Sequence, residues 1–178
     1  MIGAVVLAAG AASRFGAPKQ ELLLADVLVR LAASPVDDIV VVQGAHPLSL
    51  AGDDRVRAHV RLVDCPEWER GPGASLRCGL AVQPPEAEAV VVVLADGPDL
   101  APEAVDRVVA RWREEGGDLV AASYGGVRGH PLLLARAAWA DVPDEGFRVR
   151  EPRLVPCDDL GSPGDVDVPA DLPERFRS

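Results

Sequence analysis

The sequence contains almost no lysine. Of its 18 lysine and arginine residues, only Lys19 is a lysine. Aromatic residues are also scarce, at 4%, whereas 48% of the 178 residues are hydrophobic. The core must therefore consist mainly of Val, Leu and Ala. The length is that of one domain, which we expect to span residues 1–178.

Positive charge is in short supply overall. The formal net charge is −10 and the pI is about 4.7. A nucleic-acid-binding protein would normally carry a basic face, and an anionic membrane surface would repel this chain, so we expect neither partner. No apolar run approaches the ~20 residues of a membrane span. A small anionic ligand is compatible with this charge, because a few local donors can bind phosphate in an acidic protein.

Cysteine is rare as well. Cys65, Cys78 and Cys157 are odd in number and widely spaced, and no C-x-x-C is present. This pattern is not typical of a disulfide framework or a zinc site. We therefore expect a reducing, cytoplasmic environment. The short apolar N-terminus lacks a basic region before it, so we expect no signal peptide.

Short runs of Val, Ile and Leu are plentiful. Continuous apolar runs of this kind are typical of strands buried on both faces of a parallel sheet. The predicted strands are 2–9, 38–44, 60–64, 89–96 and 118–124. Segments with helical apolar spacing lie between them, at 21–34, 73–83 and 102–117. Strand alternating with helix predicts an α/β fold, a doubly wound, mostly parallel twisted sheet with helices on both faces.

The pattern changes in the last third of the chain. Residues 125–139 predict a short strand followed by a helix. One further strand is expected near 153–157, and a short helix near 169–176. In doubly wound sheets, ligands bind outside the carboxyl ends of the strands. The loops after 2–9 and 89–96 are therefore the candidates for a binding site.

The first of these loops is rich in small residues and ends near Lys19. Small residues let backbone N–H groups approach an anion closely, which favours phosphate binding. Five residues separate Gly10 from Gly16, so neither a P-loop nor G-x-G-x-x-G is present. The ammonium group of Lys19 can act as a compact charge against a phosphate oxygen. The alternative is an ordinary solvated surface lysine.

The second loop begins with an acidic residue shortly after a run of four valines. Asp96 should emerge at the carboxyl edge, beside the first loop. Mg²⁺ is commonly held by one or two carboxylates together with phosphates and water, so Asp96 is a candidate magnesium ligand. The alternative is an aspartate that only stabilises the turn.

The first loop resembles a known signature. The stretch "LAAGAASRFGAPKQ" is similar to the L-A-A-G-x-S-x-R-x-G-x-x-K motif of the MobA-like nucleotidyltransferases, which include the molybdenum cofactor guanylyl- and cytidylyltransferases. The resemblance implies a nucleotide-diphospho-sugar transferase type of fold. It also implies that Ala8, Ala9 and Gly10 lie near the base and ribose, and that Arg14 and Lys19 bind the triphosphate.

Further segments support the resemblance by their order and spacing. "LADGPDL" is similar to the family's L-A-D-Q-P-x-L, which implies that Asp96 binds the metal and acts in catalysis with the two basic residues. "GPGASLRCGL" is similar to G-x-x-S-S-L-R-x-G-L, which implies that Gly73, Ala74 and Ser75 line the base pocket. The other interpretation is an ordinary helix start with Ser75 near the N-cap.

Two motifs nearer the C-terminus complete the pattern. "RGHPLLL" is similar to G-H-P-V-L-F, so His130 is expected on the acceptor side, although a histidine in a turn is commonly structural. "DVDVPADL" is similar to D-x-D-T-P-x-D-L, which makes Asp167 the candidate second magnesium ligand. Alternatively, Asp165 or Asp167 caps the last helix, where Val168 replaces the usual threonine.

Other departures from the family pattern lie beside the expected site. Gly97 stands where the family has glutamine, which calls into question a side-chain contact to the acceptor that the resemblance implies. The chain also passes almost directly from Lys19 into the next helix, without the leucine-rich segment that family members usually have. These departures favour one alternative, a nucleotide- or cofactor-binding accessory protein that has lost catalysis.

The resemblance also indicates a reaction. L-A-A-G points to CTP over GTP, and residues 154–172 are similar to the branch that serves molybdenum hydroxylases. We therefore expect a Mg²⁺-dependent cytidylyltransferase that moves CMP onto a phosphorylated acceptor, molybdopterin, and releases pyrophosphate. The resemblance further implies transient contact with a molybdoenzyme or its maturation factor. A second alternative keeps the fold and the chemistry but uses a sugar phosphate or another small phosphorylated acceptor.

Overall fold

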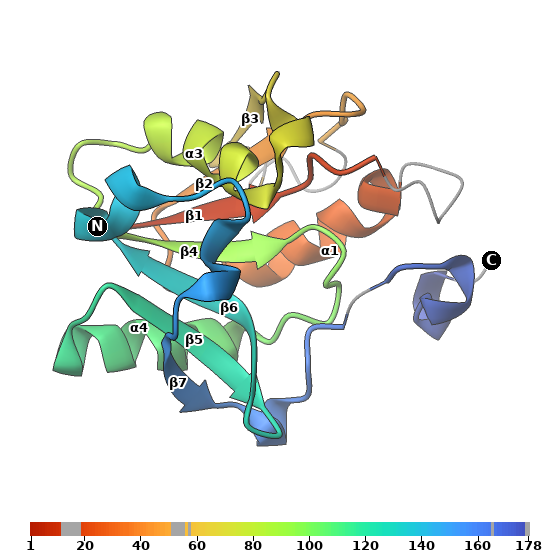
Figure 1. Ribbon diagram of the computed structural model, residues 1–178. Coiled ribbons are helices and arrows are strands. Elements are labelled where there is room, and N and C mark those ends of the chain that lie inside the picture. The colour runs from red at the N-terminus through yellow and green to blue at the C-terminus, as the bar shows by residue number, and fades with distance from the viewer. Residues whose placement is uncertain (12–18, 51–55, 57, 165, 177–178) are drawn as a thin grey trace.

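Seven strands form one sheet at the centre of the protein (Figure 1), as seen in a computed structural model. The structure describes residues 1–11, 19–50, 56, 58–164 and 166–176. The strands are β1 (Ile2–Leu7), β2 (Asp38–Gln43), β3 (Val60–Asp64), β4 (Ala89–Leu94), β5 (Leu119–Tyr124), β6 (Val127–Ala135) and β7 (Arg153–Pro156). Their order across the sheet is β3-β2-β1-β4-β6-β5-β7.

The sheet is mostly parallel. Only β6 runs antiparallel, to β4 on one side and to β5 on the other. All five strands predicted from apolar runs are present, as is the strand expected near residue 153. The order changes direction on either side of β1, which is the place where doubly wound sheets bind ligands.

Helices cover both faces of the sheet (Figure 1). Helix α3 (Pro72–Ala81) packs on one face, against β1 and β2. Helices α1 (Lys19–Ala32) and α4 (Pro102–Glu115) lie on the other face and contact each other. The predicted α/β architecture is therefore confirmed.

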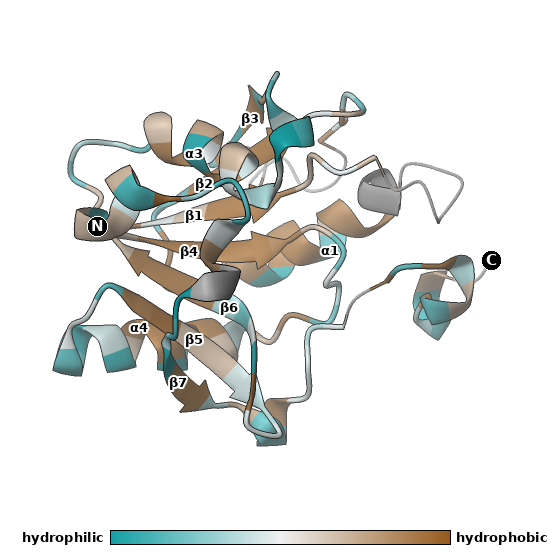
Figure 2. Cartoon of the chain, in the orientation of Figure 1, coloured by the Kyte–Doolittle hydropathy of each residue, from teal (hydrophilic) through white to brown (hydrophobic). Residues whose placement is uncertain are grey.

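Two apolar cores follow from this layering. Successive strand side chains point to opposite faces, so Val6 packs with the α1 and α4 side while its neighbour Val5 packs with the α3 side. Valine and alanine dominate both cores, as the shortage of aromatic residues predicts. Figure 2 shows the central strands as the most hydrophobic part of the chain.

The last third of the chain differs in detail from the prediction. Strand β6 is nine residues long, and the segment after it, Arg136–Asp141, is a 3-10 helix. Further 3-10 turns in this part lie at Gly146–Val149, Asp158–Leu160, Pro169–Asp171 and Glu174–Phe176, and another lies earlier in the chain at Trp68–Arg70. The expected C-terminal helix is therefore two separate short turns. No described helix is long and apolar enough to cross a membrane.

Candidate active site

The first loop leaves the sheet between β2 and β4. The backbone N–H of Ala8 donates to Val42 O at 3.0 Å, and Ala45 N donates to Ala9 O at 3.0 Å. Both alanines are buried, with 5% of their surface exposed. Larger side chains would not fit here, so the small residues place the loop backbone directly at the carboxyl edge. Gly10, the next residue, is exposed.

Arg14 and Lys19 are the two predicted triphosphate ligands. Arg14 is outside the described residues. Lys19 is the first residue of α1, which confirms that the chain passes from this position directly into a helix. The Lys19 side chain is outside the description, so its contact with phosphate stays a prediction.

Asp96 lies two residues beyond the end of β4, as expected. Its backbone carbonyl accepts a hydrogen bond from Val166 N at 3.2 Å. Asp167, the second predicted metal ligand, directly follows Val166 in the chain. The bond therefore places the backbone next to Asp167 beside that of Asp96. Mg²⁺ is commonly held by one or two carboxylates together with phosphates and water, and metal binding by Asp96 and Asp167 stays a prediction. The described residues hold no group of three or more His, Cys, Asp or Glu side chains that could bind a metal by themselves.

The start of the turn Pro169–Asp171 is capped by Asp171, a residue that the sequence analysis missed. The Oδ2 atom of Asp171 accepts hydrogen bonds from the backbone N–H groups of Asp167, at 3.2 Å, and Val168, at 3.0 Å. The sequence leaves Asp165 or Asp167 as the alternative cap, and Asp165 is outside the described residues. The metal role of Asp167 and its alternative role as a cap both stay predictions.

The C-terminal segment is attached to both sides of the site. Arg175 pairs with Asp26 of α1 at 3.0 Å and with Asp99, in the loop after β4, at 2.8 Å. Beside these ion pairs, Leu23 of α1 packs with Val166 in a small buried cluster. Figure 1 shows this segment beyond the carboxyl ends of the strands. It thus connects the helix that begins at Lys19 with the loop that carries Asp96.

Gly97 occupies the position where the family has glutamine. A Cβ atom added there would lie 3.3 Å from Pro163 Cβ, and Asp99 N donates to Pro163 O at 3.0 Å. The segment around Pro163 thus covers the space into which a glutamine side chain would extend.

His130 lies on β6, close to Asp96. Burial and the nearby Arg128 guanidinium lower the pKa of His130 to about 4, and Asp96 opposes this shift. The imidazole is therefore neutral near pH 7. Its backbone carbonyl accepts the Tyr124 hydroxyl at 3.0 Å, and its peptide bond to Pro131 is cis. The predicted role of His130 on the acceptor side stays a prediction.

A cavity of about 200 Å³ opens beside His130. Its walls come from the ends of β1 and β4, the start of α3, strand β6 and the segment 145–147. Most of the lining is apolar, and the polar groups are supplied by Arg128, His130 and Glu145. Arg128 is fixed by hydrogen bonds from Nη1 to the carbonyls of Phe147, at 2.6 Å, and Arg150, at 3.0 Å.

The start of α3 differs from the simple helix start that we had considered. Gly71 is the N-cap, without a side-chain cap, and Ser75 lies within the helix with only 4% of its surface exposed. Ser75 therefore does not cap. At Gly73, an added Cβ would overlap the Pro143 carbonyl oxygen. Packing against this neighbouring segment explains the glycine, and base binding by Gly73, Ala74 and Ser75 stays a prediction.

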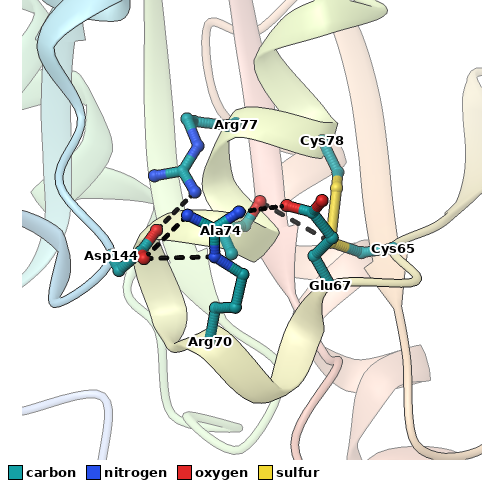
Figure 3. The surroundings of a disulfide bond; sticks show 7 residues. All are labelled: Cys65, Glu67, Arg70, Ala74, Arg77, Cys78 and Asp144. Atoms are coloured by element: carbon teal, nitrogen blue, oxygen red, sulfur yellow. Dashed lines mark hydrogen bonds and ion pairs between the residues drawn. A yellow bond between two sulfur atoms is a disulfide. The ribbon is translucent and has the colours of Figure 1, made fainter.

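One carboxylate, which the sequence analysis missed, joins that segment to α3. Asp144 pairs with Arg77 of α3 at 2.5 Å and with Arg70 at 3.1 Å (Figure 3). Its backbone carbonyl also accepts Gly73 N at 2.9 Å. The hydrogen bonds, first from Arg77 and then from Arg70, hold the pKa of Asp144 below its usual range. The residues next to Asp144 in the sequence form no pattern that would predict these ion pairs.

The cysteine prediction is wrong. Cys65 and Cys78 form a disulfide between the end of β3 and helix α3, with their Cα atoms 5.8 Å apart (Figure 3). Cys157 is free and buried. The disulfide adjoins the predicted base pocket, since Cys65 Sγ lies 3.5 Å from Ala74 O.

Comparison with known families decides the identity of the fold. Residues 4–146 match the profile of the MobA-like NTP transferase domain. The chain belongs to this family. As predicted, the protein is therefore a nucleotidyltransferase. Comparison with curated proteins gives no match.

Solved structures agree with this assignment. Rv0371c from Mycobacterium tuberculosis H37Rv is 27% identical, with a TM-score of 0.75 over 100% of this chain and 99% of that chain. A second Rv0371c structure, a complex with manganese, is 24% identical, with a TM-score of 0.65 over 99% and 95% of the two chains.

A more distant structure shares the fold. CMP:2-keto-3-deoxy-manno-octonic acid synthetase complexed with CTP is 12% identical, with a TM-score of 0.66 over 99% of this transferase and 97% of that chain.

Proposed function

We propose that this transferase moves CMP from CTP to a phosphorylated acceptor, molybdopterin, in a Mg²⁺-dependent reaction that releases pyrophosphate. The observation that carries the proposal is the meeting of three elements at one sheet edge. They are the signature loop after β1, Asp96 after β4, and the segment around Asp167 that is hydrogen-bonded to it. A nucleotide bound in the first loop would have its phosphates directed toward both carboxylates.

The choice of nucleotide rests on the loop sequence. Residues 7–10 read L-A-A-G, which in this family points to CTP over GTP. The distant neighbour that was solved with CTP has the same fold. The resemblance implies that Ala8, Ala9 and Gly10 would contact the base and ribose, and Gly10 is exposed.

The metal proposal rests on the donor set. Asp96 and Asp167 would hold Mg²⁺, which when bound neutralises phosphate charge and orients the α-phosphate. Manganese in a related structure is consistent with a divalent cation in this fold. The chain supplies carboxylates only, which suits a hard cation.

The transfer itself needs position and charge more than covalent chemistry. An acceptor phosphate oxygen attacks the α-phosphorus in line, a P–O bond forms, and the bond to the bridging oxygen of the β-phosphate breaks. Pyrophosphate leaves with the electron pair. Arg14 and Lys19 would stabilise the charge that develops on it.

The acceptor would enter through the cavity beside His130. Its mostly apolar wall suits a ring system, and Arg128 offers a fixed positive charge for an anionic group. Because His130 is neutral near pH 7, it can orient the acceptor by a hydrogen bond without adding charge. Contact with a molybdoenzyme or its maturation factor would serve to pass the product on.

Transfer of label from CTP tests the proposal. The protein is incubated with Mg²⁺, CTP labelled at the α-phosphorus and molybdopterin, and both the labelled product and pyrophosphate are measured. The proposal predicts both products, and neither with Asp96→Asn. Label transfer only to a sugar phosphate would replace the acceptor, and CTP binding without transfer to any acceptor would favour the non-catalytic alternative.

A further inference from the structure

The disulfide Cys65–Cys78 closes a loop that contains the start of the predicted base pocket. The two cysteines are separated by 13 positions. The enclosed segment holds the 3-10 turn Trp68–Arg70, the N-cap Gly71 and the first turn of α3. Closing a loop of this size removes conformational freedom from the chain. The bond therefore constrains the residues that would have to be ordered around a bound base.

The two sulfur atoms differ in their exposure. Cys65 has 1% of its surface exposed, whereas Cys78 is only partly buried on α3. Thiol–disulfide exchange begins at a sulfur that the attacking thiolate can reach, so Cys78 is the point of attack. Cys65 would be the sulfur that leaves.

A partner for the leaving sulfur is already in place. Cys65 Sγ lies 3.5 Å from Ala74 O. In the disulfide form the sulfur has no proton, but as a thiol it can donate to this carbonyl. The reduced form thus has a hydrogen bond available at the same position, on a residue of the predicted base pocket.

Ion pairs provide a second, weaker connection in the same region. Asp144 joins Arg70 and Arg77, which flank the start of α3 (Figure 3). These side chains are partly exposed, and exposed ion pairs contribute little to stability. They would still link Asp144 to Arg70 and Arg77 after reduction, but they would not restrict the loop as strongly as a covalent bond does.

We propose that Cys65–Cys78 is a reversible thiol–disulfide site that sets the affinity for the nucleotide. This inference rests on the proposed function. A dithiol reductant attacks Cys78 Sγ, the S–S bond breaks, and Cys65 leaves as a thiolate that takes up a proton. The second thiol of the reductant then displaces Cys78, which is protonated in turn. The protein gains two electrons and two protons, and the dithiol becomes a disulfide.

The oxidised form should bind the nucleotide more tightly. Its loop is already restricted, so binding orders fewer degrees of freedom than in the reduced form. We expect reduction to raise the Kd for CTP in Mg²⁺ at least about fivefold, the lower end of typical coupling between sites. The test compares the full chain before and after treatment with dithiothreitol, with thiols counted after denaturation. One free thiol marks the oxidised protein and three mark the reduced protein.

Two variants complete the test. Cys65→Ser/Cys78→Ser should bind CTP as weakly as the reduced protein, with or without dithiothreitol. Cys157→Ser removes the buried free thiol, and it should respond to reduction as the wild type does. Circular dichroism confirms that each form is folded.

Each outcome has a distinct meaning. Equal affinity for CTP in both redox states would overturn the inference and leave the proposed function intact. Loss of the native circular dichroism spectrum on reduction would also overturn it, because the bond would then be needed for folding alone. Binding of no nucleotide in either state would overturn the proposed function and the inference together.

Discussion

At the scale of single residues, the two basic groups of the first loop carry most of the functional argument. An acidic chain with a net charge of −10 can bind a triphosphate only through a local concentration of donors. Lys19 is the first residue of α1, and we predict that its compact ammonium group binds the triphosphate. We therefore expect a substitution of Lys19 to change kcat more than the Kd for CTP.

Replacing this lysine tests that role. Lys19→Ala should lower kcat about 100-fold, a typical cost of losing one donor to a developing charge. The Kd for CTP should change much less, because the contact tightens in the transition state. Lys19→Arg retains the charge and serves as the control. Equal losses in kcat and in affinity would contradict this assignment.

His130 makes a second prediction, which concerns pH. Its pKa is lowered to about 4 in the folded protein from an ordinary value near 6.5, so the unfolded state binds more protons between these two values. The free energy of unfolding should therefore rise from pH 4 to pH 6.5 and then level off. We expect a gain of about 1–3 kcal/mol, reduced from the full shift because the side chain is only partly buried.

Denaturant unfolding at several pH values measures this slope. His130→Gln should flatten it between pH 4.5 and 6.5. Asp144 does not interfere, since its pKa lies below the usual range and its contribution is lost only at lower pH. An unchanged slope in the variant would show that His130 is not the titrating group.

At the scale of elements, the contact between α3 and residues 143–146 defines one wall of the site. An alanine side chain at Gly73 would overlap Pro143 O, a backbone atom that cannot rotate away. Gly73→Ala should therefore lower the free energy of unfolding by about 1–3 kcal/mol, the usual cost of overpacking. Urea titration of both proteins measures the difference.

Gly97→Ala is the matched comparison. Its added methyl group would lie 3.3 Å from Pro163 Cβ, a contact that a small shift can relieve. We expect a change of less than about 1 kcal/mol. If Gly73→Ala were as mild as Gly97→Ala, the described packing at the start of α3 would be wrong.

Some of the strands and helices could be predicted from the sequence, and others could not. The valine runs predicted the buried strands correctly, because a strand covered on both faces needs no alternation. Strand β6 is longer than the sequence predicts. Its first half, from Arg128 to His130, is polar and has no apolar run to signal a strand, and its extended form comes from pairing with β5. The 3-10 form of 136–141 likewise had no local signal that separates it from an α-helix.

The disulfide and the Asp144 ion pairs lay beyond prediction for a different reason. Cys65 and Cys78 meet only because β3 is the edge strand beside α3. Asp144 lies 67 positions from Arg77 in the sequence. Contacts of this kind depend on how elements pack, and no single segment encodes them. The loop motifs were predictable because each one is contiguous in the chain.

At the scale of the whole molecule, the C-terminal segment brings together parts that are distant in sequence. Arg175 connects α1 with the loop after β4, and Val166 N binds the carbonyl of Asp96. One sheet edge thereby collects the first loop, the two candidate metal ligands and the cavity beside His130. The central claim is that this edge binds CTP together with Mg²⁺.

The shift in melting temperature with CTP, GTP, UTP and ATP, each with and without Mg²⁺, tests this claim most directly. A ligand at about 100 times its Kd stabilises the folded state by about 2.7 kcal/mol, which corresponds to a shift of about 5–10 °C for a domain of this size. The account predicts the largest shift with CTP and Mg²⁺, and loss of the Mg²⁺-dependent part in Asp96→Asn. The absence of a shift with any nucleotide in the presence of Mg²⁺ would contradict it.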